Sequence, residues 1–332
     1  MSFPRCCFLC IFLLLGLGIE LANSQHYRVV GGKLLPYKTI IVDQSGHGNF
    51  KTIQSAIDSV PSNNRFWVSI IVKAGIYREK VAIPVEKPYI LLQGEGKTKT
   101  LVEWADHDNT LQSATFRTLA DNIVVKFMSF INSYKSKVKL PAVAALVSGD
   151  KSYFLSVGFF GFQDTLWDDR GAHYFKSCTI KGAIDFIFGD GQSLYEDCTI
   201  SVIAAPLGPG ISGIITAQGR VSPNESSGFV FKNCVIDGTG TTYLGRPWRK
   251  YARVLFYHTK MSNIIHPNRW DPGHFRNQES HTTFAEYNNF GPGSNSSPQW
   301  TRKLGLSTVN WMASFSFIDS NGWLKTSLRI GS

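Results

Sequence analysis

Two aspartates occupy matching positions after two short apolar segments. The segments are residues 158–161 and 179–182, and Asp164 and Asp185, 21 positions apart, each lie five residues beyond the matching point of a segment. If the segments are neighbouring parallel strands in register, the carboxylates stack roughly 4.8 Å apart. Two carboxylates that close cannot both ionise easily, so the pKa of one should rise. Such a pair supplies an acid and a nucleophile from identical residue types.

Arg246 and Trp248 could complete a site of this kind. They lie in the segment Leu-Gly-Arg-Pro-Trp at 244–248. An arginine can hold a carboxylate through two parallel hydrogen bonds and keep it ionised. The tryptophan offers a flat face for a sugar ring. The alternative interpretation is a surface loop with an unrelated arginine.

Motifs of several other catalytic classes are absent from the sequence. It contains no Gly-x-Ser-x-Gly segment, which argues against a serine hydrolase of that type. It also contains no His-Glu-x-x-His, and the one Cys-x-x-Cys, at residues 7–10, has no second such segment to pair with, so we expect no metal site.

A crude repeat predicts the fold that positions these residues. Short β-rich segments recur from about residue 66, and five of them share one form, with central apolar residues 29, 21, 20 and 36 positions apart: Phe130, Phe159, Ile180, Ile200 and Ile236. A base period near 20–22 with loop insertions indicates a β-solenoid. Propeller blades need a longer period, and a sandwich needs more tight hairpins. We therefore expect an all-β protein, a single-stranded right-handed parallel β-helix.

The two ends of the solenoid have their own patterns. Residues 52–60 carry apolar side chains at helical spacing and are followed by Pro61, which predicts a short helix that caps one end. One strand is expected before this helix, at 39–42, and four after it, at 67–72, 89–93, 100–104 and 123–127. The aromatic-rich, non-repeating tail from about residue 300 should pack along the outside or cap the far end.

Residues 1–24 have the pattern of a secretory signal peptide. Arg5 precedes the apolar run 6–21, and small residues follow at 22–24. The alternative is a membrane anchor, but the run is short for a span. We therefore expect a secreted protein with a linker at 25–38, one catalytic domain at 39–325 and a tail at 326–332.

The net charge of +10 favours an anionic partner. Nucleic acid, anionic membranes and acidic polysaccharides all fit a basic protein, and secretion favours the polysaccharide over nucleic acid or membrane. The alternative interpretation is a basic surface kept for solubility.

Three cysteines lie outside the predicted signal peptide: Cys178, Cys198 and Cys234. An odd number in a secreted chain suggests one disulfide and one spare thiol. Asn224 and Asn295 begin N-glycosylation sequons, and Pro298 makes the second the weaker candidate.

Four motifs together resemble those of the pectinesterases, most closely the plant enzymes. In family order they are Gly-Ile-Tyr-Arg-Glu at 75–79, Gln-Asp-Thr-Leu at 163–166, Asp-Phe-Ile-Phe-Gly at 185–189 and the 244–248 segment. The resemblance covers residues 39 to about 325. It implies a right-handed parallel β-helix that demethylates esterified galacturonan in the plant cell wall without a metal or organic cofactor.

The resemblance also implies residue roles. Asp185 would be the nucleophile, Asp164 the proton donor and acceptor, and Gln163 a hydrogen-bond donor to the oxyanion. Arg246 would hold Asp185, and Trp248 would stack on the sugar.

Further family features concern binding and disulfide formation. Thr110 aligns more loosely with a substrate-contacting threonine. Cys198 and Cys234 match the family's paired cysteines, which leaves Cys178 as the spare thiol; the alternative is three buried free thiols.

Only about fifteen residues separate the signal from the first strand, so we expect no inhibitor-like pro-region. Methyl-esterified pectin and proteinaceous pectinesterase inhibitors are the expected partners of a monomer.

One position departs from the family pattern. The family commonly carries a glutamine where Pro141 begins the segment Pro-Ala-Val-Ala, and proline has no side-chain donor for the oxyanion. A pectin-binding wall protein with weak or no turnover is therefore one alternative. Another β-helix pectin enzyme, a lyase or a polygalacturonase, fits the aspartates and Arg246 less well.

Overall fold

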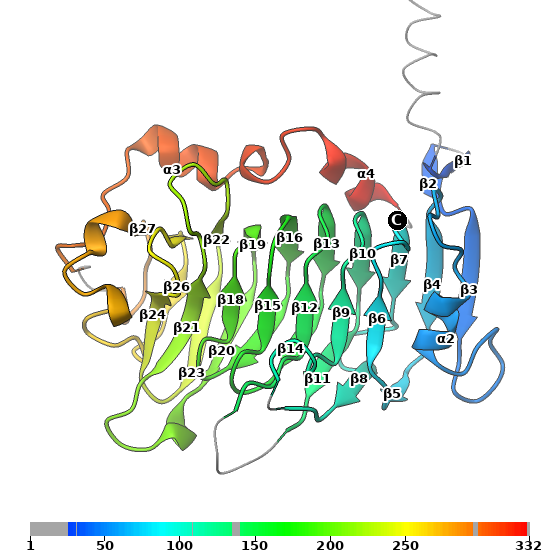
Figure 1. The fold of residues 1–332 in the computed structure, drawn as a ribbon, viewed down its shortest axis with the longest axis horizontal. Coiled ribbons are helices and arrows are strands. Elements are labelled where there is room, and N and C mark those ends of the chain that lie inside the picture. The colour runs from blue at the N-terminus through cyan, green and yellow to red at the C-terminus, as the bar shows by residue number, and fades with distance from the viewer. Residues whose placement is uncertain (1–25, 31, 108, 135–139, 295–297, 331–332) are drawn as a thin grey trace, which may run out of the picture.

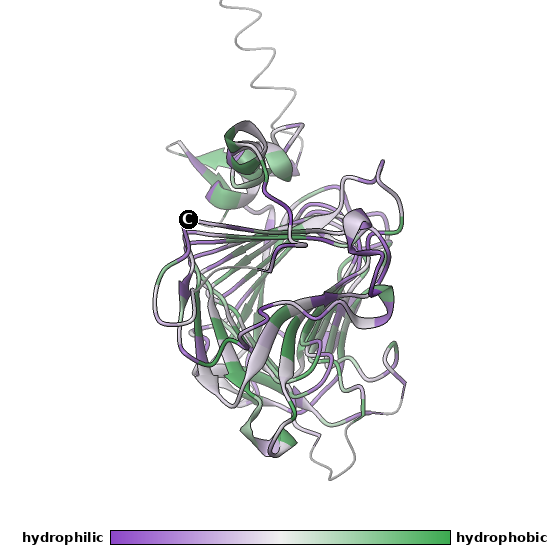
Figure 2. Cartoon of the chain, turned by 90° about the vertical axis from the view of Figure 1, so that its left-hand side faces the viewer, coloured by the Kyte–Doolittle hydropathy of each residue, from purple (hydrophilic) through white to green (hydrophobic). Residues whose placement is uncertain are grey.

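The computed structural model describes residues 26–30, 32–107, 109–134, 140–294 and 298–330. These residues form the predicted right-handed parallel β-helix, in which successive coils add strands to three parallel sheets (Figure 1). Figure 2, seen along the axis, shows the three walls that enclose the core. The predicted signal peptide lies outside the described residues. No helix within the described ranges is long and apolar enough to cross a bilayer.

The chain enters the three sheets in a fixed order in each coil, first, second and third. The first sheet contains β3 (Lys38–Val42), β4 (Val68–Val72), β7 (Ile90–Gln93), β10 (Ile123–Lys126), β13 (Ser152–Leu155), β16 (Ala172–Lys176), β19 (Gln192–Glu196), β22 (Gly228–Lys232), β25 (Arg253–Tyr257) and β27 (Thr283–Tyr287). The second sheet contains β5 (Gly75–Tyr77), β8 (Thr100–Trp104), β11 (Ser129–Asn132), β14 (Gly158–Phe160), β17 (Thr179–Gly182), β20 (Thr199–Ile203), β23 (Val235–Thr239) and β26 (Lys260–Met261). The third sheet contains β6 (Val81–Ile83), β9 (Phe116–Thr118), β12 (Ala145–Val147), β15 (Leu166–Asp168), β18 (Ile187–Gly189), β21 (Gly213–Gln218) and β24 (Thr242–Pro247).

The register of the second sheet matches the repeat seen in the sequence. The central residues of the five repeated segments pair directly with one another along the sheet: Phe130 with Phe159, Phe159 with Ile180, Ile180 with Ile200, and Ile200 with Ile236. The predicted strands at 39–42, 67–72, 89–93, 100–104 and 123–127 are also present, as β3, β4, β7, β8 and β10.

A left-handed residue turns the chain from the first sheet into the second in seven coils. In each coil one non-glycine residue has φ between 50° and 55°: Phe127, Ser156, Ser177, Asp197, Asn233, His258 and Asn288. Non-glycine residues adopt this region uncommonly. Its recurrence at one corner shows that the stack of coils, rather than each local sequence, holds the conformation.

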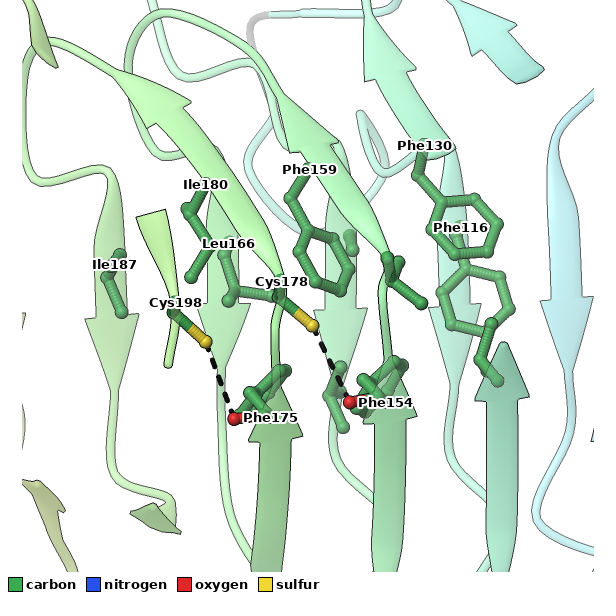
Figure 3. Packing of buried hydrophobic residues seen from close by; sticks show 14 of the residues in the cluster. Phe116, Phe130, Phe154, Phe159, Leu166, Phe175, Cys178, Ile180, Ile187 and Cys198 are labelled. Atoms are coloured by element: carbon green, nitrogen blue, oxygen red, sulfur yellow. Dashed lines mark hydrogen bonds between the residues drawn. The ribbon is translucent and has the colours of Figure 1, made fainter. Parts of the chain in front are cut away.

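Aromatic rings from the first sheet stack along the inside of the solenoid. Phe154 lies over Phe175 at 4.9 Å between ring centroids (Figure 3). Phe175 lies over Tyr195 at 4.5 Å, and Tyr195 over Phe231 at 4.6 Å. Stacked pairs contribute roughly 0.5–1.5 kcal/mol beyond the burial of their area. These stacks favour the coil register that aligns Asp164 with Asp185.

The three cysteines lie at equivalent positions beside this stack, and the expected Cys198–Cys234 disulfide is wrong. All three are buried free thiols. Each follows a left-handed corner residue, which turns its side chain inward towards a carbonyl of the first sheet. The Cys178 Sγ donates to the Phe154 carbonyl at 3.5 Å and the Cys198 Sγ to the Phe175 carbonyl at 3.4 Å (Figure 3). The three thiols therefore stack beside the first sheet as free cysteines within reach of its backbone carbonyls.

A short helix covers the first coils, as predicted. The helix α2 (Ile53–Asp58) begins after Thr52, whose side chain accepts a hydrogen bond from the Ser55 N–H. It buries Ile53, Ala56 and Ile57 against the interior core. The helix ends before Val60, which is nevertheless buried and was included in the predicted span.

The C-terminal tail packs along the outside of the first sheet. It contains α3 (Leu306–Met312) and α4 (Trp323–Arg329), with short 3-10 helices here and in loops: η2 (Ala205–Leu207), η3 (Gly273–Phe275), η4 (Glu279–His281) and η5 (Phe315–Phe317). Apolar side chains of α3, η5 and α4 join outward residues of the first sheet in a second core. Figure 1 shows α3 and α4 lying along one side of the solenoid.

The expected domain limits differ from the observed elements. The expected linker contains an antiparallel hairpin of β1 (Arg28–Val30) and β2 (Lys33–Leu35). Leu34 is buried in the second core and bridges to Ile330. The expected boundary at 325 falls inside α4. Both terminal segments therefore belong to the packed structure.

Candidate active site

Asp164 and Asp185 lie in register in the corner between the second and third sheets. Asp164 follows β14 and Asp185 follows β17, and a parallel bridge pairs Gln163 with Ile184 one residue earlier. The Asp164 N–H donates to the Ile184 carbonyl at 3.1 Å. The predicted register is therefore confirmed.

Both aspartates adopt the left-handed backbone conformation. Their φ angles are 59° for Asp164 and 46° for Asp185. Aspartate tolerates this region better than most non-glycine residues, yet each such residue still costs stability. Because the two residues share this conformation in adjacent coils, their carboxyl groups lie at the same corner of the solenoid.

Arg246 binds the Asp185 carboxylate with both arms of its guanidinium. Its Nε donates to Oδ1 at 2.9 Å, and its Nη2 donates to Oδ2. Arg246 lies on β24 two coils beyond Asp185, so its side chain passes over Ala217, the intervening residue of the same row. The Asp185 side chain is 12% exposed and that of Arg246 35%.

The two carboxyl groups have different electrostatic environments. Burial, followed by the charge of Asp185, raises the pKa of Asp164 to about 7, although the charge of Arg246 opposes the rise. Burial also raises the pKa of Asp185, but the hydrogen bonds and charge of Arg246 oppose that change. Because only Asp185 is bound by the guanidinium, Asp185 ionises first and Asp164 keeps its proton towards neutral pH.

Gln163 and Pro141 lie in adjacent coils beside the aspartates. The side chain of Gln163 is half-buried and makes no hydrogen bond to a described residue, while its carbonyl accepts the Ala142 N–H at 3.3 Å. The Gln163 amide is therefore available to a ligand. Pro141 supplies neither a side-chain donor nor an N–H.

Trp248 follows β24 beside the ion pair and is 40% exposed. The edge of Phe188 meets its ring at 5.8 Å between centroids, and the Arg249 guanidinium lies over the ring at 4.9 Å. A Cβ on Gly219 would come within 2.9 Å of the indole, so only glycine permits this packing. A cation therefore already lies over the indole ring, where the sequence suggested a sugar.

Trp167 and Phe188 form an aromatic floor that the sequence interpretation missed. Their rings stack at 5.3 Å on neighbouring strands of the third sheet. The sequence did hold a signal for them, because each lies three positions after an aspartate, Asp164 or Asp185. Equal offsets from residues in register place both rings on one face.

Comparison with known proteins identifies the family. The sequence profile of the Pectinesterase family matches residues 39–320. The chain belongs to the pectinesterase family. It is therefore a carboxylic ester hydrolase, in agreement with the resemblance of its motifs.

Similar proteins include plant pectinesterases. The chain is 54% identical to probable pectinesterase 29 of Arabidopsis thaliana over 86% of this chain and 88% of that protein. It is 53% identical to probable pectinesterase 55 of the same plant, over 86% and 90%. The solved pectin methylesterase from carrot superposes with a TM-score of 0.82 at 30% identity, covering 87% of this pectinesterase and 95% of the carrot chain.

The remaining expected site residues are not gathered at the aspartates. Thr110 lies in the loop before β9, and its carbonyl accepts the Ser113 hydroxyl at 3.1 Å. Asn224 is exposed in the loop before β22, and Asn295 lies outside the described residues. Among the described residues, no three His, Cys, Asp or Glu side chains are grouped to hold a metal ion.

Proposed function

We propose that this pectinesterase removes methyl esters from pectin and releases methanol, with Asp185 as nucleophile and Asp164 as acid and base. One observation carries the assignment of roles: two carboxyl groups lie in register, and Arg246 binds only one of them. This asymmetry favours an ionised Asp185 beside a protonated Asp164. The family and the named activity of the similar proteins support pectin as substrate.

In the first half of the reaction, a carboxylate oxygen of Asp185 bonds to the carbonyl carbon of the methyl ester. The carbonyl electrons move to oxygen, and the Gln163 amide donates a hydrogen bond to the resulting oxyanion. The oxyanion then collapses, and the bond from carbon to the methoxy oxygen breaks. Asp164 gives its proton to that oxygen, so methanol leaves and the galacturonyl group remains on Asp185.

In the second half, water hydrolyses the acyl-enzyme. Asp164, now ionised, accepts a proton from the water as the water oxygen bonds to the acyl carbon. The bond to Asp185 breaks, which returns its carboxylate to Arg246. The product is a galacturonic acid unit in the polymer, whose new carboxyl group releases its remaining proton to the solvent, and Asp164 is protonated again for the next cycle.

We also propose that the protein acts as a monomer outside the cell, in the plant cell wall. The signal-like pattern of residues 1–24 and the net charge of +10 support this location, because de-esterified pectin is an anionic polymer. Proteinaceous pectinesterase inhibitors are a second class of partner that we expect.

The function is tested by product analysis on highly methyl-esterified galacturonan. We expect methanol and titratable acid in equal amounts, without new reducing ends and without an unsaturated product that absorbs ultraviolet light. A folded protein that binds the polymer but releases no methanol would contradict the proposal. An unsaturated product would indicate a lyase, and new reducing ends a polygalacturonase.

A further inference from the structure

The turn between β24 and β25 carries Trp248 beside the catalytic ion pair. It follows Pro247, the last residue of β24, and leads to Arg253, the first residue of β25. Trp248 opens the turn two positions after Arg246, and its ring is 40% exposed. An exposed ring on a connecting turn keeps a fixed position only if the turn itself is held by the rest of the fold.

Gln218 forms hydrogen bonds with both ends of this turn. It is the last residue of β21, and its side chain is fully buried. Its carbonyl accepts the Trp248 N–H at 3.0 Å and the Arg249 N–H at 3.4 Å. Its side-chain Oε1 accepts the Arg253 N–H at 2.8 Å. A single residue therefore spans the turn from its first N–H to the start of β25.

Two further contacts fix the orientation of the Gln218 amide. The Oε1 atom also accepts the Arg220 N–H at 3.1 Å, and Nε2 donates to Asp190 Oδ1 at 3.3 Å. The same Asp190 oxygen accepts the Ser227 hydroxyl at 2.5 Å. Because Oε1 faces two N–H groups and Nε2 faces a carboxylate, a reversed amide would lose all three hydrogen bonds.

The end of β21 also supports the indole directly. The Gly219 N–H donates to the Gly189 carbonyl at 2.7 Å, and a Cβ on Gly219 would come within 2.9 Å of the Trp248 ring. The edge of Phe188 meets the other part of the ring. The indole therefore rests on the ends of β18 and β21, next to the residue that holds its turn.

Gln218 cannot itself contact the polymer, because it has no exposed surface. It can act on the substrate only through the turn that it holds. Without its side-chain oxygen, the buried N–H groups of Arg220 and Arg253 would lack an acceptor, which favours other conformations of the turn.

We propose that Gln218 is a positioning residue for the reaction, which fixes the turn that presents Trp248 to the polymer. This inference rests on the proposed function. A fixed turn places the indole against a sugar ring before the substrate arrives, so less ordering is needed on binding. Loss of this support raises KM, whereas kcat depends on the aspartates and changes little.

The test compares Gln218→Met and Gln218→Glu with wild type. Methionine has a similar length but only a weak acceptor, so the N–H groups of Arg220 and Arg253 lose their partner. Glutamate keeps an acceptor oxygen for both N–H groups. When ionised, however, it places a second carboxylate against Asp190.

Gln192→Met is the matched control, because the Gln192 side chain donates to the Phe317 carbonyl of the C-terminal tail and not to the turn. Initial methanol release from methyl-esterified galacturonan gives kcat and KM, and titration with polygalacturonate, the fully de-esterified polymer, gives Kd without turnover. Both measurements are repeated in a Trp248→Ala background, where a residue that acts through Trp248 should have little further effect. Circular dichroism and thermal unfolding establish that each variant is folded.

We expect Gln218→Met to raise KM and Kd roughly threefold to tenfold and to leave kcat within about twofold of wild type. In the Trp248→Ala background, the same substitution should change KM and Kd by less than about twofold. Gln218→Glu should match the wild-type Kd at acidic pH, where the introduced carboxyl group shares a proton with Asp190, and should bind more weakly than wild type as pH rises. Gln192→Met should match wild type.

Two results would overturn the role of Gln218. One is unchanged KM and Kd in folded Gln218→Met, and the other is the same loss with and without the indole of Trp248. If Gln218→Met does not fold, Gln218→Glu decides the question, because a Kd relative to wild type that does not vary with pH would also overturn the role. The Kd measurements decide this role even if wild type releases no methanol, an outcome that would refute the proposed function instead.

Discussion

Replacement of Arg246 tests how the ion pair activates Asp185. Removing one partner of a buried ion pair costs about 3–5 kcal/mol, because the other charge is left without compensation. The Arg246 side chain is 35% exposed, so water can replace part of the lost interaction and a smaller loss applies. We expect Arg246→Ala to reduce transition-state stabilisation by about 2–3 kcal/mol, which lowers kcat/KM about 30- to 150-fold.

The lysine variant separates charge from geometry. Arg246→Lys keeps a positive charge but cannot donate through two parallel hydrogen bonds. Its kcat/KM for methanol release should fall between those of wild type and Arg246→Ala. Without the guanidinium the pKa of Asp185 rises further, so the acid limb of the pH profile should move to higher pH in both variants.

The assay is initial methanol release from methyl-esterified galacturonan across a pH series, with Arg65→Ala as the control for loss of one arginine. Circular dichroism and thermal unfolding establish that each variant is folded. If Arg246→Ala loses less than about threefold in kcat/KM, or if its acid limb does not move, the ion pair does not hold Asp185 ionised and the reasoning fails.

The remaining predictions concern Asp164, the oxyanion donors at Gln163 and Pro141, and His173. Because the pKa of Asp164 is raised to about 7 and the acid must be protonated, methanol release should fall above that pH. A raised pKa also means that protonated Asp164 stabilises the fold, and that this contribution is lost as pH rises from the pKa of the unfolded chain towards that of the folded protein. In urea unfolding at pH 4 and pH 8, Asp164→Asn should abolish that loss. An equal change of the unfolding free energy with pH in wild type and variant would count against the prediction. Gln163→Ala should lower kcat by about 100-fold or more as the loss of an oxyanion donor, while Pro141→Gln should raise kcat if it adds a donor; an unchanged kcat in Gln163→Ala would exclude this role. Burial lowers the pKa of His173, but the Asp168 carboxylate, 2.5 Å from the imidazole, outweighs burial and raises that pKa. The unfolding free energy of wild type should therefore decline as pH rises above about 6.5, and His173→Gln should flatten that decline. An unfolding free energy of wild type that does not change with pH would show that the imidazole is neutral.

The coil register could be predicted from the sequence because a parallel solenoid stacks equivalent residues directly. The uninterrupted spacing of 21 between Phe159 and Ile180 sets the same offset for Asp164 and Asp185. This spacing alone predicts that the two carboxyl groups lie close together. The pairing of Arg246 with Asp185 followed from the resemblance of its motif, since loop insertions hide the register of the third sheet.

Other features depended on three-dimensional context. The side-chain direction of Cys198 and Cys234 follows from the left-handed corners, which spacing does not reveal. The place of Arg249 over Trp248 follows from the turn after β24.

The most direct test of the account is methanol release by Asp185→Asn. The amide has nearly the same shape as the carboxylate but cannot act as the nucleophile, and the folded variant should still bind polygalacturonate. We predict that methanol release falls by at least about 10⁴-fold, as when a catalytic nucleophile is removed. Turnover within tenfold of wild type in the folded, polymer-binding variant would contradict the central claim that Asp185 attacks the ester.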